Sequence, residues 1–188
     1  MRFEIKNIYK KYGKNIVLNK LDYVFRDGLY LVRGINGIGK STLLKTISKI
    51  ITPSNINYYI DKNKVAYLCE KVELANLKPQ EFLNSICKIN KSKHNIKEEL
   101  IKWNIPNKKI YNLSKGNKQK VALLMMRYTI ADLYLFDEPT DSLDEQGIIL
   151  FEEMISELLS DGKIVIISTH EPSYFKNFKY EVLDLCSG

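Results

Sequence analysis

The chain has 188 residues, of which 45% are hydrophobic and 27% are charged, with 29 basic against 22 acidic side chains. This length suits one globular domain with a sizeable core, and the apolar content excludes a disordered chain. No apolar run approaches the roughly 20 residues that cross a bilayer, and residues 1–20 mix charged with apolar positions, which argues against a signal peptide. We therefore expect a single domain that stays in the cytoplasm.

Cysteine spacing and charge distribution argue against two further classes of protein. Cys69, Cys87 and Cys186 are odd in number and widely spaced, so they indicate neither a disulfide framework nor a metal-ligand pair. The net charge of +7 could suit a nucleic-acid surface, but the lysine runs are dispersed and are not interleaved with stacking aromatic residues. We therefore expect no nucleic-acid partner.

Strand and helix patterns alternate along the chain, which predicts an α/β fold whose mostly parallel sheet is covered on both faces. Apolar alternation marks the strands, and apolar residues at helical spacing mark the helices. In chain order, the predicted elements are strand-like stretches within residues 2–33, a helix at Thr42–Ile51, a strand at 65–68, short helices around Phe82–Ile89 and Ile96–Trp103, a helix from Ser114, a strand at Leu133–Phe136, a helix at Ile148–Leu159 and a strand at Lys163–Ser168.

A glycine-rich segment, Gly-x-x-x-x-Gly-Lys-Ser, lies between an apolar strand pattern and the first predicted helix, as a Walker A loop requires. Its glycines let successive N–H groups face an anion, and the helix N-terminus adds partial positive charge. Lys40 would reach the β- and γ-phosphates, and Ser41 would offer a hydroxyl to Mg²⁺. The predicted ATP-binding residues of this loop are Gly34, Ile35, Asn36, Gly37, Ile38, Gly39, Lys40, Ser41 and Thr42.

Two acidic residues, Asp137 and Glu138, follow the apolar run Leu133–Phe136. Open α/β sheets bind ligands at the carboxyl ends of their strands, where Asp137 is expected to lie. A carboxylate at that position can hold Mg²⁺, and Glu138 is placed to orient and deprotonate an attacking water. The two motifs together predict a chain that binds and hydrolyses a nucleoside triphosphate.

Further motifs identify the class of ATPase. The sequence Leu-Ser-Lys-Gly-Asn at 113–117 resembles the signature motif of ABC-type ATPases, usually written LSGGQ, and Asp-Ser-Leu-Asp at 141–144 resembles their D-loop. Tyr12 matches the aromatic residue that stacks on adenine, and His170 matches the switch histidine that contacts the γ-phosphate. Packing on an edge strand for Tyr12 and a core or turn position for His170 remain the alternatives.

The resemblance implies a P-loop nucleoside triphosphate hydrolase fold with a small N-terminal antiparallel β subdomain and a compact helical subdomain. It places the core at residues 1–70 and 113–188 and the helical subdomain at about 71–112 of a single 1–188 domain. It also implies that two chains pair head to tail around two ATP molecules. Ser114 stands where an N-cap belongs, so its helix would direct donors outward. The residues expected to contact the partner's ATP are Ser114, Lys115, Gly116, Asn117 and Asp144.

Two departures from the family pattern affect the predicted site. Glu70 stands where the family usually has the glutamine of its Q-loop, and it is either a metal-contacting or coupling residue or a plain surface residue. Lys115 and Asn117 stand where the signature has a glycine and its glutamine, and we favour a solvated Lys115. Together these segments resemble the branch that serves antibiotic, bacteriocin and peptide exporters.

The expected role is the ATP-hydrolysing subunit of a transporter whose polytopic membrane subunit is a separate chain. The chain would then lie on the inner face of the cell membrane, with ATP and Mg²⁺ as cofactors and a second copy or a paralogous ATPase as its partner. The interval from Lys40 to Ser114 has no heptad run, which argues against a DNA-repair relative with a long coiled coil. A soluble ATPase acting in cofactor assembly or another non-transport process is the alternative.

Overall fold

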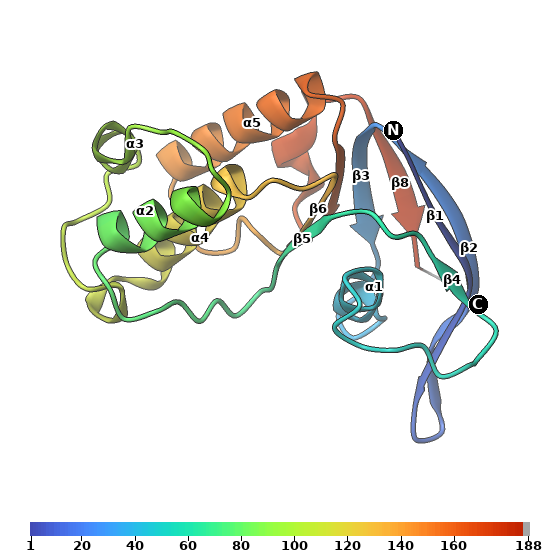
Figure 1. The fold of residues 1–188 in the computed structure, drawn as a ribbon. Coiled ribbons are helices and arrows are strands. Elements are labelled where there is room, and N and C mark those ends of the chain that lie inside the picture. Colours follow the sequence, from blue (N-terminus) through green and yellow to red (C-terminus); the bar gives the residue numbers. More distant parts are fainter. Residues whose placement is uncertain (186–188) are drawn as a thin grey trace.

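The computed structural model describes residues 1–185, in which one face of a five-stranded sheet is covered by a group of helices and the other by a single helix and a three-stranded sheet (Figure 1). Cys186 lies outside the described residues, and Cys69 and Cys87 are free thiols. The strands are β1 (Arg2–Tyr12), β2 (Asn15–Arg26), β3 (Gly28–Arg33), β4 (Tyr59–Ile60), β5 (Val65–Leu68), β6 (Leu133–Asp137), β7 (Ile164–Ser168) and β8 (Tyr180–Asp184). The helices are α1 (Lys40–Ile47), α2 (Pro79–Ile89), α3 (Ile96–Lys102), α4 (Lys115–Tyr128) and α5 (Glu145–Ser160), with 3-10 turns at Ile110–Asn112 and Pro172–Phe175.

The larger sheet has the strand order β5-β6-β7-β3-β8, and its neighbouring strands are parallel. Every residue of β6 and β7 is buried, because α2, α4 and α5 cover one face of the sheet and α1 with the three-stranded sheet covers the other. This burial explains the continuous apolar runs of the two strands, which an antiparallel sheet with one wet face would not need. The predicted α/β class and mostly parallel sheet are confirmed.

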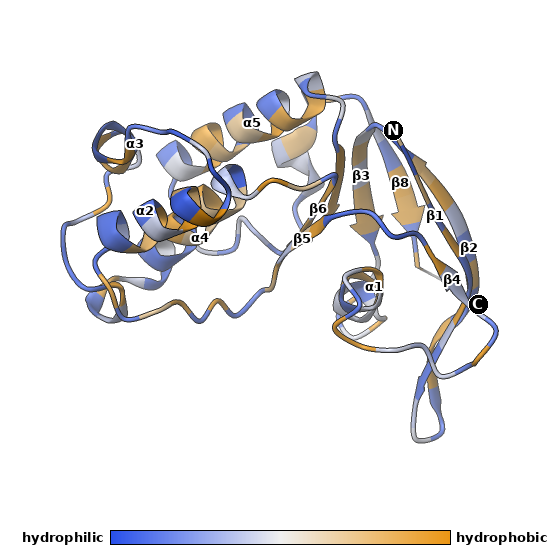
Figure 2. Ribbon diagram, viewed as in Figure 1, coloured by the Kyte–Doolittle hydropathy of each residue, from blue (hydrophilic) through white to orange (hydrophobic). Residues whose placement is uncertain are grey.

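Alternate residues of the central strands enter two separate hydrophobic cores. In β6, Tyr134 and Phe136 pack toward α2, α4 and α5, whereas Leu133 and Leu135 pack toward α1 and the N-terminal sheet. The helices turn their hydrophilic sides outward and their hydrophobic sides toward these cores (Figure 2). Successive side chains of a strand point to opposite faces of the sheet, so one apolar run contributes to both cores.

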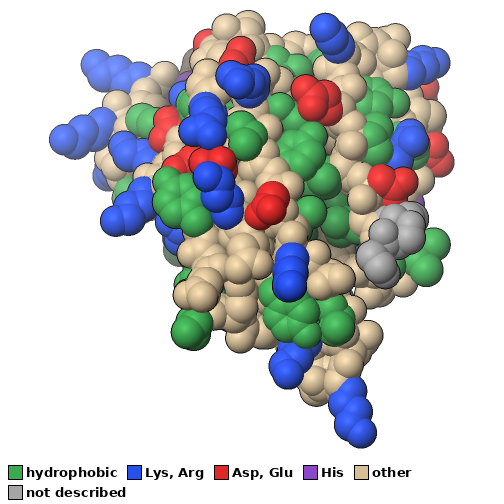
Figure 3. Space-filling model, turned by 90° about the vertical axis from the view of Figure 1, so that its right-hand side faces the viewer, with side chains coloured by type: hydrophobic (Ala, Val, Ile, Leu, Met, Phe, Trp, Pro, Cys, Tyr) green, Lys and Arg blue, Asp and Glu red, His purple; other side chains and the backbone are tan. Residues whose placement is uncertain are grey.

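The three-stranded sheet, in the order β2-β1-β4, is antiparallel and covers α1. Its strands β1 and β2 form a long hairpin, and its inward-facing side chains Phe3, Ile5 and Phe25 are fully buried. The outer side, seen in Figure 3, leaves hydrophobic side chains exposed among dispersed lysines and arginines. Ile16 and Val24 of β2 and Val182 of β8 are among the exposed residues.

The first helix ends earlier than predicted, and two strands were missed. The first helix covers Lys40–Ile47 rather than Thr42–Ile51, because Lys49 takes a left-handed backbone conformation with φ of 62°. The N–H groups of Ile50 and Ile51 then return to the carbonyl of Lys45, which closes the helix end. The apolar residues beyond Ile47 extended the apparent helical pattern. Strands β4 and β8 were not predicted: β4 has only two residues, and β8, at the edge of its sheet, is mostly exposed and lacks a continuous apolar run.

The segment between β5 and β6 carries α2 and α3, which pack with α4 against the first core. Its assignment to a helical subdomain at about 71–112, apart from a core at 1–70 and 113–188, stays a prediction. Among residues 1–185, no helix is long and apolar enough to cross a bilayer.

Replacing Phe151 of α5 with alanine should lower the free energy of unfolding by about 4 kcal/mol, because a fully buried ring would leave a cavity. The ring lies 5.3 Å from that of Phe136 and 6.2 Å from that of Phe175, measured between centroids. Urea unfolding checks the value. Ile101→Ala is the control, since Ile101 is 79% exposed and its loss should cost less than about 0.5 kcal/mol.

Candidate functional site

The glycine-rich loop connects the end of β3 to the start of α1, as the sequence predicts. Gly39 precedes the helix with φ of 122°, a conformation that favours glycine. A Cβ atom at Gly39 would lie 2.6 Å from Cγ1 of Val17, so β2 also leaves no space for a side chain. Strand β2 and the loop therefore hold each other in place, and Val17 is a supporting residue that the motif did not reveal.

Lys40 begins α1 and folds back over the loop that precedes it. Its side chain is buried, and Nζ donates a hydrogen bond of 2.9 Å to the carbonyl oxygen of Gly34. The same Nζ lies 3.8 Å from Oε1 of Glu138. The ammonium group thus stands between the phosphate loop and the acidic motif, where an anionic ligand would meet it.

Asp137 ends β6 and is only 2% exposed, and three hydroxyl groups hold its carboxylate. Oδ1 accepts hydrogen bonds from Ser41 at 3.0 Å and from Ser168 at 2.6 Å, and Oδ2 accepts one from Tyr67 at 3.1 Å. Burial, followed by the nearby charge of Asp137, raises the pKa of Tyr67, so its hydroxyl keeps its proton. Three hydroxyl donors therefore satisfy the hydrogen-bonding capacity of this buried carboxylate.

Glu138 follows with a left-handed backbone, φ of 48°, which turns its side chain toward the loop. Oε2 accepts from the backbone N–H of His170 at 3.1 Å, and Oε1 lies 3.0 Å from Nε2 of the same residue. The backbone N–H of Glu138 donates to Oγ of Ser168 at 3.1 Å. Burial raises the pKa of Glu138, while the nearby His170 acts in the opposite direction. A carboxylate with a raised pKa suits proton abstraction.

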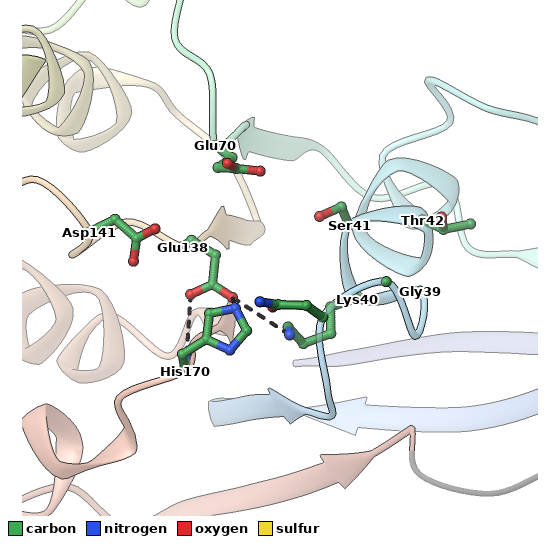
Figure 4. Close-up of a pocket in the computed structure, with 10 residues that line it drawn as sticks. Gly39, Lys40, Ser41, Thr42, Glu70, Glu138, Asp141 and His170 are labelled. Atoms are coloured by element: carbon green, nitrogen blue, oxygen red, sulfur yellow. Dashed lines mark hydrogen bonds and ion pairs between the residues drawn. The ribbon is translucent and has the colours of Figure 1, made fainter.

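Lys40, Ser41 and Glu138 line a cavity of about 450 Å³, a size typical of small-molecule sites, whereas Asp137 is not among its lining residues. In Figure 4 the loop residues approach from one side, and Glu138, Asp141 and His170 approach from the other, with Glu70 at the rim. His170 is 45% exposed, so it is not a core histidine. The lining residues are Asn36, Gly37, Gly39, Lys40, Ser41, Thr42, Glu70, Glu138, Asp141 and His170.

The donor set of the site fits a nucleotide-bound magnesium ion. Among residues 1–185, no three His, Cys, Asp or Glu side chains cluster so as to hold a metal by themselves. Ser41 and Asp137 instead offer one hydroxyl and one carboxylate beside the cavity. Mg²⁺ is commonly bound by one or two carboxylates together with substrate phosphates, so a hydroxyl and a carboxylate suffice here.

The signature segment lies at the start of α4, outside the cavity lining. Oγ of Ser114 accepts from the N–H of Asn117 at 3.2 Å, which confirms Ser114 as the N-cap. A Cβ atom at Gly116 would lie 2.5 Å from the carbonyl oxygen of Ser142, so only glycine fits this approach of helix and loop. Ser114 and Lys115 are exposed to solvent.

Two further contacts join α4 to the loop that follows Glu138. Gln119 donates to the carbonyl oxygen of Pro139 at 3.0 Å, and Nζ of Lys120 donates to Oδ2 of Asp144 at 2.8 Å. Asp144 also caps α5 by accepting from the N–H of Gly147 at 2.8 Å. Asp144, predicted to contact a partner's ATP, is therefore engaged within its own chain.

The structure gathers most predicted site residues and leaves some apart. Tyr12, at the end of β1, is exposed and lies outside the cavity lining, with Nζ of Lys10 5.4 Å from its ring centre. Gly34, Ile35 and Ile38 are also outside the lining, although they belong to the loop. The contact of Tyr12 with adenine stays a prediction. The supporting residues that the sequence did not predict are Val17, Tyr67, Gln119, Lys120 and Ser168. Of these, Ser168 could have been found, because it is a polar residue at the end of a buried strand.

The profile of the family described as ABC transporter matches residues 19–141. The chain belongs to this family. An uncharacterized ABC transporter ATP-binding protein from Methanocaldococcus jannaschii, MJ1023, is 31% identical across all of this chain and 75% of its own length. The lantibiotic transport ATP-binding protein SrtF of Streptococcus pyogenes is 28% identical over 89% of this chain and 79% of its own.

The fold agrees with that of solved family members. The ATP-binding subunit of an ABC transporter superposes with a TM-score of 0.82 over 97% of this chain and 86% of the other, at 23% identity. Its membership of the ABC transporter family makes the protein an ABC-type ATPase.

Replacing Asp144 with asparagine should destabilise the folded chain near pH 7 by about 1 kcal/mol, after allowance for solvent around the exposed carboxylate. Asparagine can still cap α5, but it leaves the ammonium of Lys120, which is 3% exposed, without its anionic partner. The hydrogen bond from Lys120, then that from Gly147, lowers the pKa of Asp144 below its ordinary 3.8.

The advantage of the wild-type chain should therefore be present above pH 3.8 and disappear as the pH falls through the lower pKa of the folded state. Urea unfolding at a series of pH values measures the difference. Asp161→Asn, at the other end of α5, is the matched control and should change the stability little. An equal effect of the two substitutions at every pH would contradict the assigned ion pair.

Proposed function

We propose that two copies of this chain close around two ATP molecules and that their opening and closing drives export through a separate membrane subunit. The observation that carries the proposal is the single cavity in which the phosphate loop faces Glu138 and His170. The exposed start of α4 lies outside that cavity, where a second chain could present it to ATP. A homodimer is the simplest assembly, and a paralogous ATPase could take the place of one copy.

Hydrolysis would proceed by attack of water on the γ-phosphorus, which breaks its bond to the β,γ-bridging oxygen and releases ADP and inorganic phosphate. Glu138 would accept a proton from that water, since its carboxylate is buried and turned toward the cavity. Lys40 and His170 would hold the γ-phosphate oxygens, because the ammonium group and the imidazole ring both line the same cavity. Mg²⁺, held by Ser41 and Asp137, would supply charge neutralisation on the phosphates when bound.

The signature residues would act on the ATP of the partner. The helix N-terminus and the exposed hydroxyl of Ser114 can donate to a phosphate, and Lys115 adds positive charge nearby. Gly116 and Asn117 would complete this surface. Asp144 would contact the partner's nucleotide. It would also fix the position of the loop that it ends. Its hydrogen bond to Lys120 ties that loop to the signature helix.

Coupling to the membrane subunit would occur beside Glu70. Glu70 lines the nucleotide cavity and also a smaller cavity of about 220 Å³ shared with Lys71, Lys115 and Lys118. A membrane-subunit segment seated in the second cavity could therefore sense the nucleotide through one side chain. Glu70 would act as a coupling residue there or as a contact to metal-bound water.

The direction and cargo of transport rest on resemblance. Relatives are named for zinc import, macrolide export and lantibiotic transport, so the family as a whole leaves the cargo open. Glu70 and the 113–120 segment favour the branch of peptide and antibiotic exporters. We therefore propose a peptide or antibiotic-like cargo and a position on the cytoplasmic face of the membrane. The second candidate is a soluble ABC-type ATPase of cofactor assembly.

Replacing Glu138 with glutamine should reduce ATP hydrolysis at least about 100-fold, because glutamine cannot accept the proton. ATP binding should remain, so the variant should accumulate as an ATP-bound dimer, visible by size-exclusion chromatography with ATP and Mg²⁺. Glu171→Gln serves as the matched control, since Glu171 is exposed and bonded to Ser173. Undiminished hydrolysis by Glu138→Gln would remove Glu138 from its role.

The same Glu138→Gln variant distinguishes the two candidate functions. Purified gently from native membranes with ATP present, it should bring with it a polytopic membrane protein, whose identity would narrow the cargo. Recovery from the soluble fraction, alone or with an assembly factor, would instead support the cofactor-assembly ATPase.

Mixing two inactive variants tests whether the site is shared between chains. Lys40→Ala removes the phosphate-binding ammonium, and Ser114→Arg blocks the exposed signature surface. If each ATP lies between the loop of one chain and the signature of the other, a mixed dimer has one complete site. An equimolar mixture should then recover about a quarter of the wild-type rate, since about half of its dimers are mixed. A mixture as inactive as its components would contradict the head-to-tail arrangement.

A further inference from the structure

Asp137 has three hydroxyl partners, of which the proposed chemistry uses only one. Ser41 is a predicted magnesium ligand. Ser168 lies opposite Asp137 on the neighbouring strand β7 and joins the two strands by its hydrogen bond. The third donor, Tyr67, holds Oδ2 at 3.1 Å, whereas both serines bond Oδ1. No part of the nucleotide site described above requires this phenol.

The position of Tyr67 is fixed by the sheet rather than by the nucleotide loop. It lies on β5 opposite Leu135 of β6, and its ring packs partly against the second hydrophobic core. Its hydroxyl can therefore reach the end of β6 without a change of backbone. Because the two carboxylate oxygens accept from different donors, the group cannot rotate without losing at least one hydrogen bond.

We propose that Tyr67 is a positioning residue that orients the carboxylate of Asp137 toward nucleotide-bound Mg²⁺. The inference rests on the proposed function, since it assigns Mg²⁺ to Ser41 and Asp137. The phenol acts through Asp137 and touches neither the nucleotide nor the reacting water. Its loss leaves Oδ2 free to turn, so the carboxylate meets the metal in the required orientation for only part of the time.

The placement of Tyr67 also connects the metal site to Glu70. Strand β5 ends at Leu68, and Glu70 follows two positions later at the rim of the cavity. A movement of Glu70 that pulls on β5 would therefore lengthen the Tyr67–Asp137 hydrogen bond. Tyr67 therefore links the strand that leads to Glu70 with the carboxylate of Asp137 through one hydrogen bond.

Tyr67→Phe removes this hydroxyl and leaves the ring in place. Binding of a fluorescent ATP analogue is measured by titration with Mg²⁺ present and again with EDTA. We expect the Mg²⁺-dependent affinity to fall about tenfold, the size of one hydrogen bond to a charged group, and the affinity in EDTA to stay unchanged. The hydrolysis rate should need a higher Mg²⁺ concentration for half-saturation and recover most of its maximum at saturating Mg²⁺.

Tyr134→Phe is the matched control. Tyr134 is a buried tyrosine on the adjacent strand β6, and its hydroxyl bonds the carbonyl of Thr129 and the N–H of Ala131, away from Asp137. Its removal should lower the stability without changing the Mg²⁺ dependence. Thermal unfolding of both variants without ligand establishes that each remains folded.

The outcomes separate the two levels of the proposal. Tyr67→Phe with an unchanged Mg²⁺ dependence, or with an equal loss of affinity in EDTA, would overturn the positioning role. A wild-type chain that binds ATP equally well with and without Mg²⁺ would overturn the metal site of the proposed function, whichever way the variant behaves.

Discussion

The parallel direction of the central strands is the constraint on which the site depends. Strands β3, β5, β6 and β7 run the same way, so their carboxyl ends meet at one edge of the sheet. The phosphate loop follows β3, Glu70 follows β5, Asp137 and Glu138 end or follow β6, and His170 follows β7. Residues more than a hundred positions apart are thereby brought to a single cavity.

Buried charge at this edge is balanced by specific partners. The ammonium of Lys40 has the carbonyl of Gly34 and the carboxylate of Glu138 near it, and Asp137 receives three hydroxyl donors. Unpaired, either group would carry a large desolvation cost inside the protein. These partners hold Lys40 and Asp137 in place beside the cavity in which we propose that ATP and Mg²⁺ bind.

The start of α4 is joined by several contacts to the loop that follows Glu138. Gly116 meets the carbonyl of Ser142, Gln119 meets that of Pro139, and Lys120 meets Asp144. One face of the signature helix is therefore attached to the loop that follows Glu138. A partner's nucleotide seated on Ser114 would act on a body already joined to Glu138, which gives the two sites of a dimer a physical connection.

The sequence by itself determined the chemistry and the class of fold. The spacing of Gly34, Gly39, Lys40 and Ser41 is local, so the loop could be recognised without knowledge of distant contacts. Asp137 and Glu138 were identified because a wholly apolar run marks a buried parallel strand, and the N-cap at Ser114 follows from its residue type. The end of the first helix was misplaced because a left-handed Lys49 leaves no trace in an apolar pattern.

Only the tertiary structure decided which side chains support the site. Tyr67 and Ser168 converge on Asp137 because β5, β6 and β7 are neighbours, and strand order cannot be read from periodicity. Lys120 resembled one more member of a lysine run until its burial beside Asp144 distinguished it. A local motif predicts what its own segment can bind. The partners of a buried charge depend on which segments the fold places beside it, and that is set by packing across the whole chain.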